Sequence, residues 1–190
     1  MNICMALLWL AFAFWHVQTF RVTGNIALLF FCASETLLAY FFIFRSASRR
    51  VSHDVGAWSV AIAGTAAPLI LSPTGNLILS GGTALIMLAA LVQVAGLFSL
   101  NRSFAVVPAQ RVIKTSGLYR YVRHPMYASY SFSFTGYLLV SMSLYNVLVI
   151  STAIVLLFFR INFEEEHLLD DEMYRSYCSR VRWRLIPFVY

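Results

Sequence analysis

The sequence predicts an all-α integral membrane protein, a bundle of about six transmembrane helices in a single domain over residues 1–190. Of the 190 residues, 60% are hydrophobic and only 12% are charged, and the mean hydropathy is +0.74. A soluble domain carries about twice that share of charged residues. Long apolar runs recur along the chain, and basic residues gather at alternate connections between them, as is typical of polytopic membrane proteins.

Four apolar runs fill residues 1–100, and we expect each to form a transmembrane helix. The first run, residues 5–20, lacks a basic segment before it and a small-residue cleavage site after it, which favours a retained helix over a signal peptide. The second and third runs cover residues 25–44 and 57–71, and the third ends at the turn sequence SPTG. The fourth, residues 76–100, is long enough to span, and its glycines favour close helix packing: Gly81, Gly82 and Gly96.

The second half of the chain begins with its only long polar segment, residues 101–123. A short fifth helix is expected over residues 125–140, a turn near residues 141–146 and a sixth helix over residues 147–163. The tail, residues 164–190, carries charges of both signs and is expected to begin as a helix.

The basic residues predict the orientation of this bundle. All but one of the 14 lysines and arginines follow the second, fourth or sixth run or stand at its exit, and the exception is Arg21 after the first. Because basic residues are retained on the cytoplasmic side, the pattern predicts six spans with both termini in the cytoplasm. Membrane boundaries and anionic headgroups then account for the net charge of +6, and we expect no nucleic-acid partner.

The cysteines and histidines predict neither a disulfide framework nor a metal site. The three cysteines are far apart, the four histidines are scattered, and no spacing between them is typical of metal ligands.

The segment GLYRYVRHPMY, residues 117–127, combines the features of a ligand-binding turn. Pro125 lacks an N–H and suits the first position of a helix, whereas His124, which precedes a proline, is disfavoured in the helical conformation. We therefore expect a loop, a sharp turn and a helix start, with Tyr127 in the first helical turn. A helix start attracts anions and the rings of Tyr119, Tyr121 and Tyr127 attract cations, so the turn suits a zwitterion. The alternative is a basic helix start that contacts lipid headgroups.

A second cluster stands where the sixth helix leaves the membrane, in FFRINFEEE at residues 158–166. Arg160 and Glu164 share one helix face, in the order that supports a helix less well. The three carboxylates are either a solvated face that neutralises the basic loop or part of one cytosolic pocket with the turn at residues 117–127. Such a pocket would match the carboxylate, ammonium and sulfonium of S-adenosylmethionine.

Glu35 is the only acid inside an expected span. An intramembrane carboxylate is costly and indicates a functional site by default. The alternatives are a neutral carboxyl group and one that is hydrogen-bonded to a polar group of a neighbouring helix.

Together, these residues resemble the isoprenylcysteine carboxyl methyltransferase family of integral-membrane enzymes, which is akin to the phospholipid N-methyltransferases. The resemblance rests on G-x-Y-x-x-x-R-H-P-x-Y at residues 117–127 and R-x-x-x-E-E-x-x-L at residues 160–168, followed by Tyr174, Tyr177 and Ile186-Pro187. It covers roughly residues 100–190. It implies that residues 101–190 are the catalytic half, with a cytosolic cofactor pocket between the loop before the fifth helix and the tail.

The resemblance implies S-adenosylmethionine as the cofactor and assigns residues to it. The backbone of Arg111, Val112, Ile113 and Lys114 would line the cofactor. The other contacts would come from Tyr119, His124, Pro125, Met126, Tyr127, Glu164 and Glu165. Arg160 would orient the methyl acceptor, and the expected catalytic residues are Arg160 and Glu164.

The sequence departs from the family pattern at two places. Arg111 stands where the family usually has a histidine, and the stretch between the acidic cluster and Tyr174 is about two residues short and lacks a Phe-Gly pair. The second departure affects the tail and any acceptor contact made there. Membrane sterol reductases also carry an RHP-type turn, but with Asn after the proline, where this chain has Met126.

The expected function is methyl transfer from S-adenosylmethionine to an amphiphilic, lipid-like acceptor, such as an isoprenylcysteine-type carboxylate. An amine or a thiol acceptor stays open, and membrane lipids are the expected partners. The alternatives are an NADPH-dependent reductase of a sterol or isoprenoid, and a non-enzymatic scaffold or transport component in which Glu35 is the key residue.

Overall fold

The computed structural model describes the chain except for residues 1, 44–49, 52–53, 101–108 and 111–112. The helices are α1 (Asn2–Thr23), α2 (Ile26–Ile43), α3 (Val55–Ala66), α4 (Gly81–Leu100), α5 (Pro125–Val140), α6 (Leu144–Leu168) and α7 (Glu172–Arg180). Short 3-10 helices η1 (Ala67–Ile70) and η3 (Gly117–Arg120) join them. The all-helical class is confirmed.

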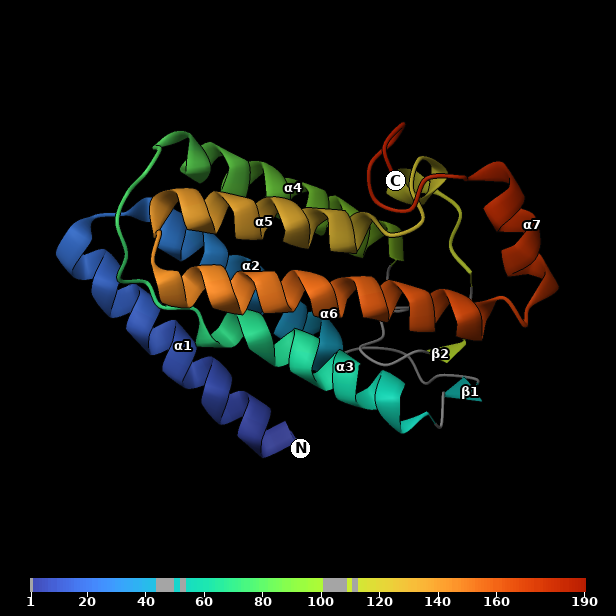
Figure 1. Cartoon of the computed structure of the whole chain (residues 1–190), viewed down its shortest axis with the longest axis horizontal. Coiled ribbons are helices and arrows are strands. Elements are labelled where there is room, and N and C mark those ends of the chain that lie inside the picture. The colour runs from blue at the N-terminus through green and yellow to red at the C-terminus, as the bar shows by residue number, and fades with distance from the viewer. Residues whose placement is uncertain (1, 44–49, 52–53, 101–108, 111–112) are drawn as a thin grey trace.

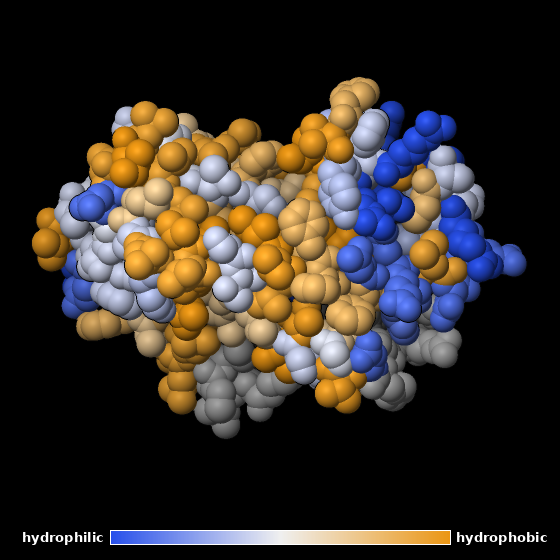
Figure 2. Space-filling model, in the orientation of Figure 1, coloured by the Kyte–Doolittle hydropathy of each residue, from blue (hydrophilic) through white to orange (hydrophobic). Residues whose placement is uncertain are grey.

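The long helices run lengthwise through the molecule, and α7 lies beyond the end of α6 (Figure 1). Beside α7 lie the start of α5, the end of α6 and the C-terminal segment, residues 181–190. We call this region the polar end, because hydrophilic side chains gather over it while apolar side chains cover most of the rest (Figure 2). Two short strands, β1 (Arg50–Val51) and β2 (Ala109–Gln110), pair antiparallel and were not predicted.

Among the residues that the structure describes, two helices, α4 and α6, are long and apolar enough to cross a membrane. Shorter apolar stretches cover Ile26–Tyr40 and Val55–Ile70. Six membrane spans therefore remain a prediction.

The fifth helix has the bounds predicted for it. His124 is its N-cap with φ −128° and ψ 61°, outside the helical region, and Pro125 follows at the first helical position. This local geometry is what a proline and its preceding residue dictate.

The predicted start of the fourth helix at residue 76 is wrong, because α4 begins at Gly81. Asn76 instead pairs with Met142 through two backbone hydrogen bonds of 2.8 Å. The amides of Ile78 and Leu79 donate to the carbonyl of Leu139. This connection is extended because it hydrogen-bonds to the turn between α5 and α6.

The sixth helix is longer than predicted and closes the end of the bundle opposite the polar end. Ser143 caps it by accepting from the amide of Asn146. The fully buried Asn146 side chain donates to the carbonyls of Ser72 and Ser141 at 2.9 and 2.7 Å, and accepts from the amide of Ser72 at 3.0 Å. The side-chain amide of Asn146 thus joins the connection after η1 to the turn between α5 and α6.

Glycines set the closest helix contact. A Cβ added to Gly82 would lie 2.7 Å from the carbonyl oxygen of Gly136, and one on Gly136 would lie 2.8 Å from that of Gly82. The backbones of α4 and α5 therefore approach as small residues allow, as predicted for the fourth helix. This contact holds α4 and α5 close together near the end of α5.

Candidate active site

The Glu165 carboxylate, near the end of α6, is surrounded by two arginines and a histidine. Its Oε1 lies 3.0 Å from Nε2 of His124 and 3.2 Å from Nε of Arg123, and its Oε2 lies 2.8 Å from Nη2 of Arg184. The Glu165 side chain is only 6% exposed. A buried carboxylate needs such partners to offset its loss of hydration. Glu165 therefore ties the α5 start, α6 and the C-terminal segment together.

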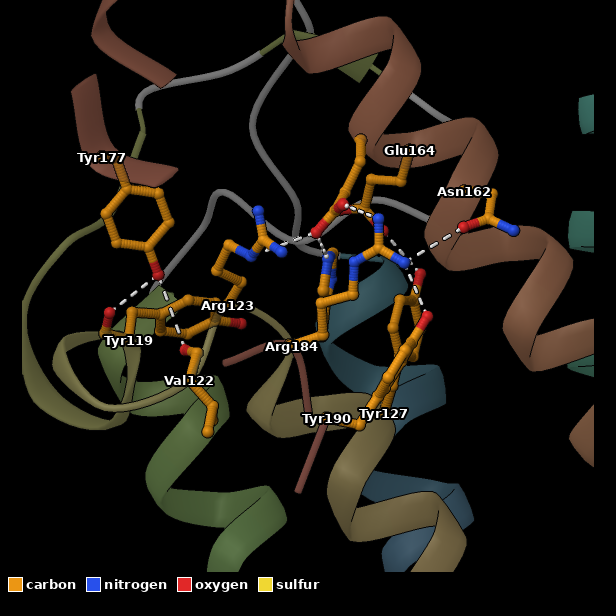
Figure 3. Close-up of polar contacts among 11 residues, drawn as sticks. Tyr119, Val122, Arg123, Tyr127, Asn162, Glu164, Tyr177, Arg184 and Tyr190 are labelled. Carbon is orange, nitrogen blue, oxygen red and sulfur yellow. Dashed lines mark hydrogen bonds and ion pairs between the residues drawn. The ribbon is translucent and has the colours of Figure 1, made fainter. Parts of the chain in front are cut away.

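Glu164, the neighbour of Glu165, faces a different partner. Its Oε2 accepts a hydrogen bond of 2.7 Å from the hydroxyl of Tyr127, in the first turn of α5 (Figure 3). Glu164 is half-buried, whereas Tyr127 is buried. The two sequence blocks, separated by more than thirty residues, thus meet through two adjacent carboxylates.

Arg160, one helical turn before Glu164, lies over the ring of Tyr127. The centre of its guanidinium is 5.2 Å from the ring centroid, within cation–π range. One of its nitrogens donates to Oγ1 of Thr65 on α3 at 3.3 Å. A cation, a phenol and a carboxylate therefore lie next to one another where α3, α5 and α6 meet.

A column of rings extends from this group into the bundle along one face of α5. His124 stacks on Tyr127, Tyr127 on Tyr130, and Tyr130 on Phe134, with centroid distances of 5.4, 6.3 and 6.1 Å. The buried Glu35 of α2 interacts electrostatically with Tyr130. The column presents aromatic faces from the polar end toward the interior.

The turn before α5 is held from the opposite side by α7. The hydroxyl of Tyr177 donates to the carbonyl of Tyr119 at 2.7 Å and approaches that of Val122 at 3.5 Å (Figure 3). Burial is the main cause that raises the pKa of the Tyr119 and Tyr177 phenols, so each stays protonated. Tyr177 therefore stabilises the conformation of the turn. Tyr174 packs beside Tyr177, together with Ile113, and so supports this contact.

The C-terminal segment crosses the start of α5. The amides of Arg123 and His124 donate to the carbonyls of Trp183 and Arg184 at 2.9 and 2.8 Å. Burial opposes the charge of Arg184, but its hydrogen bond to the Tyr190 hydroxyl and the Glu165 carboxylate outweigh this effect and raise its pKa. This segment therefore forms one wall of the site.

The remaining residues predicted to contact the cofactor have varied placements. Arg111 and Val112 lie outside the described residues. Lys114 is half-buried, and Pro125 is buried in the helix start. Met126 is buried against α4, where its sulfur would lie 2.9 Å from a Cβ on Gly96.

Sequence reasoning missed the part played by Arg184. Arg184 lies two residues before Ile186-Pro187, which was part of the family resemblance. No local sequence pattern, however, relates Arg184 to Glu165. Arg123 stood inside the predicted turn without an assigned role. The described residues contain no group of three His, Cys, Asp or Glu side chains that could hold a metal ion.

Comparison with known proteins relates this site to a family. Residues 77–176, which run from the connection before α4 into α7, match the family model described as phospholipid methyltransferase. No curated protein matches the chain. The match covers just over half of the chain and includes the turn at residues 117–127, Arg160, Glu164 and Glu165. The family implies methyltransferase activity, and together with the two long apolar helices it implies association with a membrane. The chain belongs to the phospholipid methyltransferase family.

Proposed function

We propose that this protein transfers a methyl group from S-adenosylmethionine to an amphiphilic, lipid-like acceptor at the polar end of the bundle. The observation that carries the proposal is the contact between Tyr127 and Glu164, with Arg160 over the Tyr127 ring. These groups come from both sequence blocks of the family, and they lie where apolar helices give way to charged residues.

The chemistry of the side chains fits this cofactor. S-adenosylmethionine carries a carboxylate, an ammonium and a sulfonium, and the sulfonium supplies the transferable methyl group when the cofactor is bound. The half-buried Glu164 carboxylate suits its cations, and Tyr119 and Tyr127 would contact the cofactor from η3 and from the first turn of α5. His124, Pro125 and Met126 would shape its seat at the α5 start. The segment 111–114, which includes Ile113 and Lys114, would supply backbone contacts.

Glu165 would contribute to the cofactor pocket by positioning. Because its carboxylate already contacts Arg123, His124 and Arg184, it holds these three side chains in place. Precise placement of the nucleophile and the methyl carbon accelerates a displacement reaction, so we expect a rigid site to raise the rate of methyl transfer.

Arg160 and Glu164 would act on the acceptor. Arg160 can bind a carboxylate acceptor, such as that of an isoprenylcysteine-type lipid, through two parallel hydrogen bonds. For an amine acceptor, Glu164 would accept the proton that nitrogen loses on methylation. The apolar tail of either acceptor would lie between the helices.

The proposal includes six membrane spans, with the polar end and both termini in the cytoplasm. It is supported by the hydrophilic surface of the polar end and by the described cations located there, which include Lys114, Arg120, Arg123, Arg175, Arg180, Arg182 and Arg184.

The direct test is saturable binding of tritiated S-adenosylmethionine to the detergent-purified chain, followed by mass spectrometry of labelled products from a lipid extract. Glu164→Ala and His124→Ala should weaken cofactor binding, whereas Glu166→Ala, which removes an exposed neighbouring carboxylate, should not. Absence of saturable binding by the folded wild-type chain would refute the proposal.

Arg160→Ala separates the two roles within the site. It should lower kcat/KM for the acceptor while leaving cofactor affinity within about twofold, because Arg160 is assigned to the acceptor. Arg175→Ala, at an exposed position on α7, is the matched control. Equal losses of cofactor affinity and acceptor kcat/KM would contradict the assignment.

A further inference from the structure

The C-terminal segment carries an exposed apolar loop, residues 186–190, and Tyr190 at its end accepts a hydrogen bond from Arg184 of the site. Phe188 is 86% exposed and Val189 is 74% exposed, and Ile186 and Pro187 are exposed beside them. These residues lie beyond the family match, which ends at residue 176. Large exposed apolar side chains in a cluster indicate an interaction surface.

The backbone holds this loop in an unfavourable conformation. Phe188 has φ +66°, a left-handed value that side chains with a Cβ rarely adopt. The loop is closed by the main-chain oxygen of Tyr190, which accepts from the amides of Arg184, Leu185 and Ile186. Such conformations persist where the surrounding structure enforces them and cluster at functional positions. Here the outcome is a phenylalanine ring presented outward.

Arginines precede the loop in sequence, and Trp183 and Arg184 contact its rings. Residues 175–190 contain four arginines and no acidic residue. Arg180 and Arg182 are exposed, and the ring of Trp183 lies 5.5 Å from that of Phe188. Aromatic rings beside arginines are typical of segments at the boundary between lipid headgroups and acyl chains.

The position of the loop in the molecule also suits contact with a membrane surface. The C-terminal segment projects at the border between the polar end and the apolar flank (Figure 1), and apolar atoms protrude there beside hydrophilic ones (Figure 2). A membrane that surrounds the apolar flank would end at this border.

We propose that the loop at residues 186–190 inserts Phe188 and Val189 into the headgroup–acyl boundary of the membrane, with Arg180 and Arg182 facing anionic headgroups. The adjacent residue Leu185 is buried in the cluster that contains Tyr127, and Arg184 contacts Glu165. Lipid contact at the loop would therefore hold one wall of the site in place. This inference goes beyond the proposed function and needs no methyl transfer for its test.

The test is spin-label accessibility in the full chain, reconstituted in vesicles of phosphatidylcholine and phosphatidylglycerol. Cys4, Cys32 and Cys178 are replaced by serine, and single labels are placed through Phe188→Cys and, separately, Val189→Cys. The control label is placed through Ser176→Cys, on the exposed face of α7. Labels at 188 and 189 should collide more with oxygen, which dissolves in lipid, than with a water-soluble nickel chelate, and the control label should show the reverse.

Nickel accessibility at 188 and 189 equal to that at 176 would overturn the proposal. So would protection of both sites from oxygen and nickel alike, since this would indicate coverage by protein, such as a second copy of the chain. Two reporter sites guard against a local effect of the label at the strained position 188. Binding of S-adenosylmethionine is measured on the same samples, so failure of the proposed function is detected separately.

Discussion

Replacing Glu165 by glutamine should loosen the polar end while leaving the apolar bundle intact. The substitution keeps the size of the side chain but removes the negative charge that faces Arg123, His124 and Arg184. Breaking a buried ion pair from one side costs about 3–5 kcal/mol. Because Arg184 is 30% exposed, water offsets part of this loss, and we expect roughly 2–4 kcal/mol.

Two measurements report this loss. Thermal unfolding in detergent should show a midpoint lower by roughly 5–15 °C, at about 2–4 °C per kcal/mol for a chain of this size. Hydrogen exchange should accelerate at the amides of Arg123 and His124, whose acceptors are carbonyls of the C-terminal segment. Exchange within α4 should change little.

Glu166→Gln is the matched control, because it removes the same charge from the exposed neighbouring position. A double-mutant cycle between Glu165→Gln and Arg184→Gln should give a coupling of about 0.5–3 kcal/mol. Equal shifts for the variants at 165 and 166, or additive losses in the cycle, would refute the central role of Glu165.

Three further predictions concern the scaffold. Gly82→Ala should destabilise the protein by about 1–3 kcal/mol in thermal unfolding, because its Cβ would overlap the facing backbone of α5, whereas Gly81→Ala should be tolerated. Tyr177→Phe should cost about 1–2 kcal/mol and weaken cofactor binding, because a buried carbonyl of η3 loses its donor; Tyr121→Phe, at an exposed position, should leave both measurements unchanged. Asn146→Ala should cost about 2–4 kcal/mol in thermal unfolding without affecting cofactor affinity, and a weaker cofactor affinity would show that the two ends of the bundle are coupled.

Local rules predicted the parts of the fold that depend on local chemistry. The start of α5 follows from Pro125 and from His124 before it, so both the first residue of α5 and the conformation of the N-cap were predictable. The start of α4 was not, because hydropathy does not distinguish an apolar extended segment from an apolar helix. The pairing of Asn76 with Met142, distant in sequence, decides it.

The same division holds at the candidate site. The alternation of basic connections predicted that the turn at residues 117–127 and the acidic cluster share one side of the bundle, but it left open whether they touch. The contacts of Tyr127 with Glu164 and of His124 with Glu165 decide that question. The contact of Arg184 with Glu165 depends on how residues 181–190 fold back, and no periodicity or motif encodes that path. Glu164 and Glu165 look equivalent in sequence, and only the geometry gives them separate partners.

The tight crossing of Gly82 and Gly136 has a consequence for movement. Two helices whose backbones touch at their crossing have little room to slide past each other there, so we expect α4 and α5 to move together. If the proposed acceptor enters from the bilayer, we expect the widening for its lipid tail to come from displacement of α6 rather than from separation of α4 and α5. A label-to-label distance between α4 and α5 should stay constant on addition of acceptor, while a distance from α5 to α6 should lengthen.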